Sequence, residues 1–311
     1  MMSDYLLKNG KVLLFQQNED KIDIAIKEKE ILIQQGKIAK IENKIQENQY
    51  PNAEILDATH CVIMPGLINT HAHIPMSLFR ESTEGCKLYD WLENKIWPQE
   101  DKLTNEDVYY ASMLSFIEMI STGTTCINDQ YFLQDAIRKA AEDMGVRAVL
   151  TRTVIGEKEE AEKKIAEFKR FYETREKQND LIKYKVAPHS LYTCSPEALQ
   201  LTANLAKELK LPIHVHFLES IDEIEDIKQK HGERAIKVLK KYFDGIHTIL
   251  AHAVHLDDED IAILKTMDCG IAHNPVSNLR LGCTIADTTK YLQNNLNVAL
   301  RNRWTRFTEV T

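Results

Sequence analysis

The sequence predicts an α/β fold in which residues 61–300 form a (β/α)8 barrel, also called a TIM barrel, and residues 1–60 form a small all-β unit. Two observations predict the barrel. From residue 61 onward, short apolar strands alternate with longer helical patterns, and seven such units plus the start of an eighth match the count of this fold. Histidines also stand at the ends of several of these strands, where the barrel gathers its functional side chains.

Composition sets the broad class of protein. The 311 residues suffice for about two domains or one large barrel, and 43% hydrophobic with 28% charged residues is typical of a globular enzyme. The net charge of −8 argues against a surface that binds nucleic acid. Six scattered cysteines without a Cys-x-x-Cys pair indicate reduced thiols. Because neither a leader pattern nor an apolar run of about 18 residues is present, we expect a cytoplasmic protein without a membrane partner.

The first 60 residues contain short runs in which apolar and polar side chains alternate. Runs at 11–15, 22–26, 30–33 and 38–41 predict strands joined by hairpin turns. Small sheets of this kind are marginally stable when they stand alone. The unit has few large apolar residues, so we expect it to need a partner segment that completes its core.

The barrel elements follow from hydrophobic periodicity and from turn signals. The first long helix begins at about Thr104, a residue type that caps helix N-termini well. The many charges of the later helices are most simply explained as solvated faces. The predicted strands are residues 62–73, 124–129, 147–154, 182–189, 212–217, 248–252, 270–273 and 296–300. The predicted helices are residues 104–117, 133–144, 157–177 and 222–241, with approximate ends.

The first predicted strand ends in His71-Ala72-His73. Successive side chains of a strand point to opposite faces, so this spacing directs both imidazoles the same way. Two neutral imidazoles can form one edge of a metal site. A polar strand end that holds two histidines explains the pair equally well, because two ligands alone do not make a site.

Further histidines favour the functional interpretation. His189, His216 and His252 lie at or near the ends of three other predicted strands. In a barrel the ends of all the strands converge on one mouth. Histidines at four separate strand ends are difficult to explain as core filling, and we expect them to form one site.

Several motifs, taken in order, carry a family resemblance. The chain resembles the amidohydrolase superfamily, and within it the cytosine-deaminase-like branch that includes chlorohydrolases and methylthioadenosine/S-adenosylhomocysteine deaminases. The resemblance spans roughly residues 3–300 and implies a distorted barrel flanked by a small β-sandwich domain built from both chain termini. The motifs are Pro65-Gly66-Leu67-Ile68-Asn69-Thr70-His71-Ala72-His73, Trp97-Pro98-Gln99-Glu100-Asp101, Ala187-Pro188-His189-Ser190, His214-Val215-His216-Phe217-Leu218-Glu219-Ser220, Ala251-His252-Ala253-Val254-His255-Leu256 and Ala272-His273-Asn274-Pro275-Val276-Ser277-Asn278-Leu279.

The resemblance implies a metal site. The family's histidine ligands fall on His71, His73 and His216, whereas His214 lies one layer deeper and is expected to be a satisfied core histidine. Superfamily members with two metals bridge them with a modified lysine at the end of the fourth strand. Lys185 comes too early in that strand, which indicates a single divalent metal. Zn²⁺ is the first expectation and Fe²⁺ the alternative, since histidine and carboxylate ligands do not separate them.

The resemblance also implies catalytic and substrate-binding residues. Glu219 matches the family's acid, which protonates a ring nitrogen of the substrate, and His252 matches a histidine that holds or polarises the attacking hydroxide. Glu100, Arg152 and His189 match positions that contact the ribose or the distal part of the substrate. For each of these three, an ordinary salt bridge or cap is an alternative role.

The implied reaction is the hydrolytic deamination of a purine nucleoside of the methylthioadenosine/S-adenosylhomocysteine type, with release of ammonia. A chlorohydrolase or a guanine deaminase on the same scaffold is the enzymatic alternative. A non-catalytic remnant that at most binds metal or partners is the alternative from another class. The partner is expected to be a small heteroaromatic amine, and a homo-oligomer remains open.

The last residues depart from the family pattern. The family has an aspartate just after the eighth strand, usually in Gly-Thr-Asp-Gly, but here Leu300 is followed by Arg301-Asn302-Arg303-Trp304-Thr305-Arg306-Phe307. The codons AGG AAC AGA TGG ACC AGA for residues 301–306, read one base later, give Gly-Thr-Asp-Gly-Pro. We therefore expect a frameshift after Leu300 and an aberrant tail over residues 301–311.

Such a truncation has structural consequences. We expect a barrel that is incomplete at strand 8, with open edges at the first and seventh strands, and hence an unstable or inactive product. Asp287 is the candidate that would replace the missing aspartate if the chain is active after all.

Overall fold

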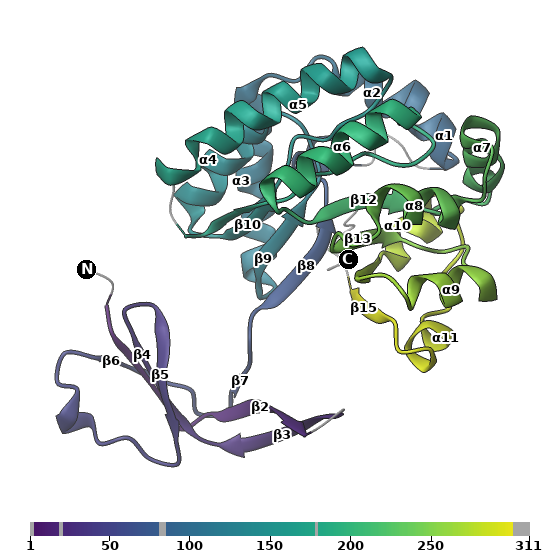
Figure 1. Cartoon of the computed structure of the whole chain (residues 1–311). Coiled ribbons are helices and arrows are strands. Elements are labelled where there is room, and N and C mark those ends of the chain that lie inside the picture. The colour runs from purple at the N-terminus through teal and green to yellow at the C-terminus, as the bar shows by residue number, and fades with distance from the viewer. Residues whose placement is uncertain (1–2, 19–20, 81–84, 178–179, 301–311) are drawn as a thin grey trace. The chain divides into compact units, whose positions relative to one another are not determined.

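The computed structural model describes residues 3–18, 21–80, 85–177 and 180–300, and the chain divides into two compact units (Figure 1). The division falls between Gly66 and Leu67 rather than after residue 60, where the sequence analysis placed it. The reason is a short strand at Val62–Ile63 that pairs with Lys11 and Val12 and so belongs to the N-terminal unit.

The N-terminal unit is all-β, as predicted. It contains a four-stranded sheet in the order β5-β4-β1-β6 and a three-stranded sheet in the order β3-β2-β7. Leu6, Leu32 and Ile45 form its small buried core. Its strands are β1 (Tyr5–Lys8), β2 (Lys11–Asn18), β3 (Lys21–Glu28), β4 (Glu30–Gln34), β5 (Lys37–Glu42), β6 (Glu54–Asp57) and β7 (Val62–Ile63), with a 3₁₀ turn η1 (Glu47–Gln49) before β6.

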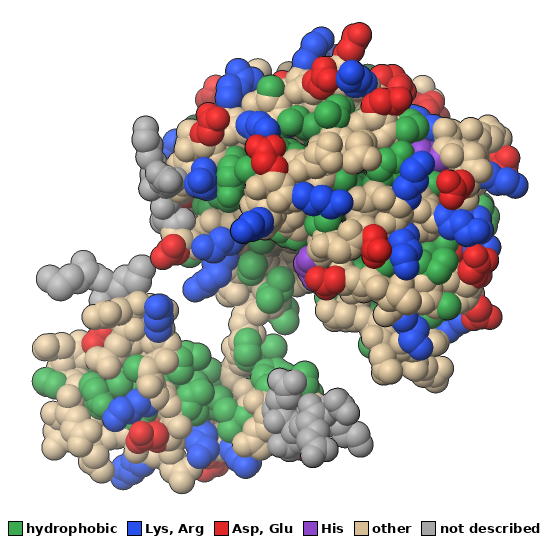
Figure 2. Space-filling view, in the orientation of Figure 1, with side chains coloured by type: hydrophobic (Ala, Val, Ile, Leu, Met, Phe, Trp, Pro, Cys, Tyr) green, Lys and Arg blue, Asp and Glu red, His purple; other side chains and the backbone are tan. Residues whose placement is uncertain are grey.

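One face of the β2–β3 hairpin is apolar and exposed. Ile22, Ile24 and Ile26 alternate along β3, and each exposes more than half of its surface. Figure 2 shows apolar side chains on the visible surface of this unit. These three isoleucines form an apolar patch on one strand face of the unit.

The C-terminal unit contains the eight barrel strands. Two four-stranded sheets have the orders β11-β10-β9-β8 and β12-β13-β14-β15, and all their pairings are parallel. Bridges from Val186 to Ile213 and from Ser190 to His216 join the end of β11 to β12. The strands are β8 (Leu67–Ala72), β9 (Thr124–Asp129), β10 (Arg147–Leu150), β11 (Ile182–Tyr184), β12 (Ile213–Phe217), β13 (Thr248–His252), β14 (Cys269–His273) and β15 (Asn297–Leu300).

The eighth strand covers the edge of the seventh. β15 pairs with β14 over four residues, from Gly270 opposite Asn297 to His273 opposite Leu300. The hydroxyl of Thr70 on β8 donates to the carbonyl of Leu300 at 3.1 Å, so β15 also reaches the first strand. The expected open edge at the seventh strand is therefore wrong, because the four apolar-rich residues before the tail suffice to form the strand.

Helices connect successive strands and lie outside them (Figure 1). The predicted cap at Thr104 is confirmed: Thr104 and Asp107 form a reciprocal capping box. The helices are α1 (Leu88–Trp91), α2 (Trp97–Glu100), α3 (Asn105–Ser121), α4 (Gln134–Met144), α5 (Lys158–Glu173), α6 (Pro196–Leu209), α7 (Asp222–His231), α8 (Ala235–Phe243), α9 (Asp258–Leu264), α10 (Pro275–Arg280) and α11 (Thr288–Gln293). The 3₁₀ helices of this unit are η2 (Ile74–Phe79) and η4 (Thr174–Lys177), and η3 (Leu92–Ile96) is a short π-helix.

The prediction of one continuous helix over residues 222–241 is wrong. The segment forms α7 and α8, which are separated at Gly232. Gly232 has φ of 74°, a left-handed conformation that glycine adopts without steric cost, and its N–H donates to the carbonyl of Lys228. The glycine therefore ends α7 and lets α8 change direction.

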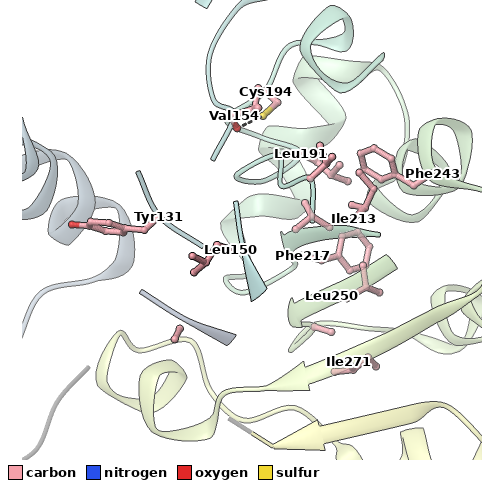
Figure 3. Close-up of a cluster of buried hydrophobic side chains, with 14 of the residues drawn as sticks. Tyr131, Leu150, Val154, Leu191, Cys194, Ile213, Phe217, Phe243, Leu250 and Ile271 are labelled. Atoms are coloured by element: carbon pink, nitrogen blue, oxygen red, sulfur yellow. Dashed lines mark hydrogen bonds between the residues drawn. The ribbon is translucent and has the colours of Figure 1, made fainter. Parts of the chain in front are cut away.

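The barrel interior and the helix-facing layer share one apolar core. Phe217, Leu250 and Ile271 come from three neighbouring strands and pack beside one another, with Leu191 and Phe243 close by (Figure 3). All five are at most 2% exposed. This continuous packing holds the strand ends, and the polar side chains they carry, in fixed positions.

Two sequence predictions concern the surface and the tail. None of the described helices combines the length and the apolar character that crossing a bilayer requires. The predictions about residues 301–311 lie outside the described residues and stay predictions. Asp287 is exposed and caps α11 by accepting from the N–H of Lys290, so its carboxylate already has a structural role.

Candidate metal and active site

Four histidines from three strand ends meet at one point. His71 and His73 come from the end of β8, His216 from β12 and His252 from β13. The ring centroid of His71 lies 4.8 Å from those of His73 and His216 and 5.2 Å from that of His252. All four are at most 6% exposed. Parallel strands in register bring them together, because each strand contributes its last residues to the same layer.

Hydrogen bonds fix which ring nitrogens of His73 and His216 carry protons. Nδ1 of His73 lies 2.6 Å from the carbonyl of Gln130, and Nδ1 of His216 lies 2.6 Å from the carbonyl of His189. A carbonyl oxygen only accepts, so both Nδ1 atoms donate. In neutral imidazoles this leaves a lone pair on each Nε2.

The two Nε2 lone pairs face each other. Nε2 of His73 lies 3.2 Å from Nε2 of His216. Two acceptors at this distance repel unless a cation lies between or beside them. Two nitrogens bound tetrahedrally to Zn²⁺, at ~2.0–2.1 Å each, would stand about 3.3 Å apart. The observed separation therefore fits a shared metal ion, and carbonyl-anchored Nδ1 atoms are the usual second layer of such sites.

His71 and His252 complete the imidazole cluster. Ligand nitrogens of His71, His216 and His252 all lie within 4.8 Å of one another. Nε2 of His71 is buried and has no hydrogen-bond partner among the described residues. An orphaned buried lone pair is costly unless something binds it. The donor set of neutral imidazoles suits Zn²⁺ or another borderline divalent metal.

The surroundings of His71 and His216 keep these two imidazoles neutral. Burial, reinforced by the neighbouring His73 and His216, holds the pKa of His71 well below its ordinary value. Burial, followed by the effects of His189 and His73, does the same to the pKa of His216. Neutral imidazoles are the form that ligates metals.

Glu219 stands beside the imidazole cluster. An Oε1 atom of Glu219 lies 3.2 Å from Nδ1 of His252, and the same Nδ1 lies 2.6 Å from Oδ1 of Asn278 on α10. Because both neighbours offer oxygens, Nδ1 of His252 donates and its Nε2 is the acceptor. Glu219 is 5% exposed and lines the cavity described below. The carboxyl group is thus positioned for proton transfer next to the cluster.

Three non-glycine residues beside these side chains have a strained backbone conformation. Leu218, His252 and Ala253 have φ of 48°, 76° and 47°, in the left-handed region that non-glycine residues rarely adopt. Each such residue costs about 1–3 kcal/mol and persists where the surroundings enforce it. The strained turns after β12 and β13 set the directions of Glu219 and His252.

A cavity of about 530 Å³ opens over the cluster. His73, His216 and Glu219 line its floor, and the three predicted substrate contacts, Glu100, Arg152 and His189, line it as well. Its other walls are largely apolar. They include Met76, Leu88, Leu92, Ile96, Trp97 and Phe132.

The structure also gives Arg152 and His189 local partners. Nε of Arg152 donates to Glu167 at 2.6 Å, so the ordinary salt bridge foreseen for this residue is present. Nδ1 of His189 lies 2.9 Å from the hydroxyl of Thr193. Both contacts orient the side chains at the cavity wall, and neither prevents contact with a ligand.

Three polar residues near the site have roles that the sequence analysis did not assign. Asn278 orients His252, Gln130 orients His73, and Glu223 holds the backbone of Glu219. Asn278 lay within a motif that was singled out, without a role attached to it. For Glu223 the available signal was its position one helical turn after Glu219, at the start of a charged helix.

The three histidines that were predicted to hold the metal lie together in the structure, and His252 lies beside them. His71, His73 and His216 adjoin one another as expected, and His252 lies as close to His71 and His216 as a ligand would. His214 is fully buried with both ring nitrogens in hydrogen-bond contact, as expected for a core histidine.

Comparison with known proteins assigns the family. The profile of the Amidohydrolase family matches residues 62–301, which is more than half of the chain. The chain belongs to the amidohydrolase family. This match covers the barrel with all of its clustered histidines.

Curated relatives of this amidohydrolase are nucleoside deaminases by name. The 5'-deoxyadenosine deaminase of Methanococcus maripaludis is 41% identical over 280 residues, which are 88% of this chain and 66% of that protein. The 5-methylthioadenosine/S-adenosylhomocysteine deaminase of Carboxydothermus hydrogenoformans is 42% identical over 298 residues, 95% of this chain and 67% of that protein. The amidohydrolase chain thus spans about two thirds of the length of these relatives.

Solved structures confirm the fold of the amidohydrolase chain. The guanine deaminase of C. acetobutylicum with bound guanine has a TM-score of 0.82 at 24% identity, covering 96% of this chain and 74% of that one. The zinc-bound adenosine deaminase of Xanthomonas campestris has a TM-score of 0.83 at 24% identity, covering 98% and 69%. At this identity the likeness shows the barrel fold alone.

Glu223 generates a prediction about stability. Its Oε1 accepts from the N–H groups of Glu219 at 2.9 Å and Ser220 at 3.1 Å, and its side chain is buried. Burial, and next the charge of Glu219, raises the pKa of Glu223 to about 8 from an ordinary 4.5. Between pH 4.5 and 8 the folded chain keeps a proton that the unfolded chain releases, so the free energy of unfolding falls as pH rises through this window.

We expect Glu223→Gln to flatten this pH dependence, because the amide still accepts both N–H groups but does not titrate. Chemical denaturation at several pH values between 5 and 9 measures it. Glu225→Gln, an exposed carboxyl on the same helix, is the matched control and should leave the slope unchanged. Parallel curves for Glu223→Gln and the parent would contradict the assignment.

Proposed function

We propose that this amidohydrolase chain carries the active site of a metal-dependent hydrolytic deaminase, which acts on a purine nucleoside modified at the 5' position and releases ammonia. The observation that carries the proposal is that Glu219, which contacts His252, lines the same cavity as the facing imidazoles of His73 and His216. The names of the curated relatives support the choice of a nucleoside.

His71, His73 and His216 would hold one divalent metal, with His252 adjacent. Zn²⁺ is the first candidate and Fe²⁺ the second, since imidazole ligands serve both. Bound there, the metal would supply hydroxide at neutral pH, because it lowers the pKa of water to about 7. The carbonyls of Gln130 and His189 keep the Nε2 lone pairs of His73 and His216 directed at the ion.

Glu219 and His252 would manage the protons. Glu219 donates a proton to the ring nitrogen next to the carbon that carries the amino group, which relieves negative charge as the nucleophile attacks. Nδ1 of His252, held by Asn278, keeps the Nε2 acceptor aimed at the cluster, where it can accept a hydrogen bond from the attacking group. Glu219, by then a carboxylate, takes the proton of the added hydroxyl group and passes it to the amino group, which leaves as ammonia while the carbonyl forms.

The cavity walls fit a nucleoside better than a bare base. Glu100, Arg152 and His189 offer polar groups for ribose hydroxyls, whereas Leu88 and Leu92 offer an apolar surface for the base or a 5' substituent. Pockets of 300–1,000 Å³ are typical of small-molecule sites, and this one lies within that range. We place the activity in the cytoplasm, supported by six cysteines that are all free thiols.

A substrate panel tests the proposal. Release of ammonia and of chloride is measured with 5'-deoxyadenosine, methylthioadenosine, S-adenosylhomocysteine, guanine and a chlorotriazine. We expect ammonia from the 5'-modified adenosines, because the cavity offers polar groups for a ribose beside an apolar surface. A preference for guanine, or release of chloride, would overturn the choice of substrate.

Glu219→Gln should abolish most of the turnover while metal content and fold are retained. Glutamine keeps the size and the hydrogen bonding of the side chain but has no carboxyl proton to transfer, and loss of acid–base catalysis typically costs about 10²–10⁴-fold. The rate constant for ammonia release and the metal content are both measured, with Glu225→Gln as the control. A rate within about threefold of the parent, well short of that range, removes Glu219 from the mechanism.

His216→Ala should weaken metal binding more than about tenfold, since even losing the hydrogen-bond partner of a ligand costs ~10–100-fold. Metal affinity is measured by competition with a chelator. His247→Ala, an exposed histidine just before β13, is the matched control. Unchanged affinity in His216→Ala would show that the metal binds elsewhere.

A further inference from the structure

Behind the imidazole cluster lies a buried chain of hydrogen bonds that ends at a lysine. Nδ1 of His71 lies 3.0 Å from Nε2 of His214, and Nδ1 of His214 lies 2.5 Å from Nζ of Lys185. Nζ of Lys185 also donates to Oδ1 of Asn128. Lys185, His71 and His214 are 0% exposed. A fully buried lysine whose amine contacts only an amide and an imidazole in these two bonds is rare and calls for a reason.

The far end of this chain is fixed by the backbone. Nδ2 of Asn128 donates to the carbonyl of Thr70 at 3.0 Å, and a carbonyl only accepts. The amide of Asn128 therefore presents its oxygen to Lys185, which must donate to it. One direction remains to be determined, namely that of the contact between Lys185 and His214.

The two possible directions have opposite consequences for His71. If Lys185 donates to Nδ1 of His214, then His214 carries its proton on Nε2 and donates it to Nδ1 of His71. A neutral His71 must then carry its own proton on Nε2, which cannot ligate a metal. If Lys185 instead accepts from Nδ1 of His214, the bonds from Lys185 to His214 and from His214 to His71 both reverse, and the lone pair of His71 appears on Nε2.

We propose that Lys185 is a positioning residue for the metal site: as a neutral amine it accepts from Nδ1 of His214, so that His214 accepts from His71 and His71 presents its Nε2 lone pair to the metal. This inference rests on the proposed metal site and assigns a task to a lysine that the deamination mechanism does not use.

Two further observations support this direction. Nε2 of His71 is buried and lacks a hydrogen-bond partner among the described residues, as a metal ligand requires and as an N–H donor would not tolerate. Complete burial lowers the pKa of Lys185 well below its ordinary value, although Asp129 acts in the opposite sense. A metal cation bound to the cluster would disfavour a second positive charge in the same interior.

Variants of Lys185 test the proposal through metal affinity. Lys185→Met has no polar end, whereas Lys185→Gln is one bond shorter than lysine but its amide offers both a donor for Asn128 and an acceptor for His214. We expect Zn²⁺ affinity, measured by chelator competition, to fall about 10–100-fold in Lys185→Met and to recover in part in Lys185→Gln. Lys183→Met, at an exposed lysine two residues earlier in the chain, is the control and should match the parent. Unfolding curves of the metal-free proteins are compared alongside.

The outcomes separate the inference from the function it rests on. Parent-like affinity in Lys185→Met, or no gain in Lys185→Gln, overturns the role of Lys185 and leaves the metal site standing. Absence of Zn²⁺ binding in both the parent and Lys183→Met overturns the metal site and the inference together.

A measurement on the parent protein needs no variant to fold. In the zinc-loaded chain, ¹⁵N NMR of the histidine side chains reports which nitrogen of His214 is protonated. The proposal requires the proton on Nδ1. A proton on Nε2 of His214 overturns it, whatever the affinities of the variants.

Discussion

The site depends on one constraint: a buried neutral imidazole has one donor and one acceptor, and each must be accounted for. The backbone carbonyls of Gln130 and His189 accept hydrogen bonds from Nδ1 of His73 and of His216. The Nε2 lone pairs of His73 and His216 are then directed at each other across 3.2 Å. Such an arrangement is unfavourable without a cation, so the fold stores electrostatic repulsion that binding of a metal would relieve.

The barrel maintains this arrangement because it fixes the positions of the strand ends. β12, β13 and β14 pair in unbroken register, which sets the depth of His216 and His252, and the apolar layer around Phe217 and Leu250 prevents these ends from shifting. The strained turn residues Leu218 and Ala253 persist because this packing enforces them. The packed core therefore fixes the positions of the side chains at the cavity floor.

Much of this could be predicted from the sequence, because the signals were local. Strand periodicity, the spacing of His71 and His73, and histidines at separate strand ends were sufficient to place the cluster. The break at Gly232 was missed, since a charged helical pattern masked a single glycine. The partners Asn278, Gln130 and Lys185 could not be assigned from sequence, because their contacts join elements far apart in the chain and depend on depth within the barrel.

The depth of Lys185 below the cavity floor also bears on the number of metal ions that the site would hold. A lysine that bridges two metals must reach the cavity floor, whereas Lys185 lies one layer below, where Asn128 and His214 occupy its amine. His214 therefore acts as a spacer between Lys185 and the layer of His71. The same strand position that excludes Lys185 from bridging allows it to direct the tautomer of His71 from behind. The single metal site proposed above and the burial of Lys185 would then follow from the same position of Lys185, one layer below the cavity floor.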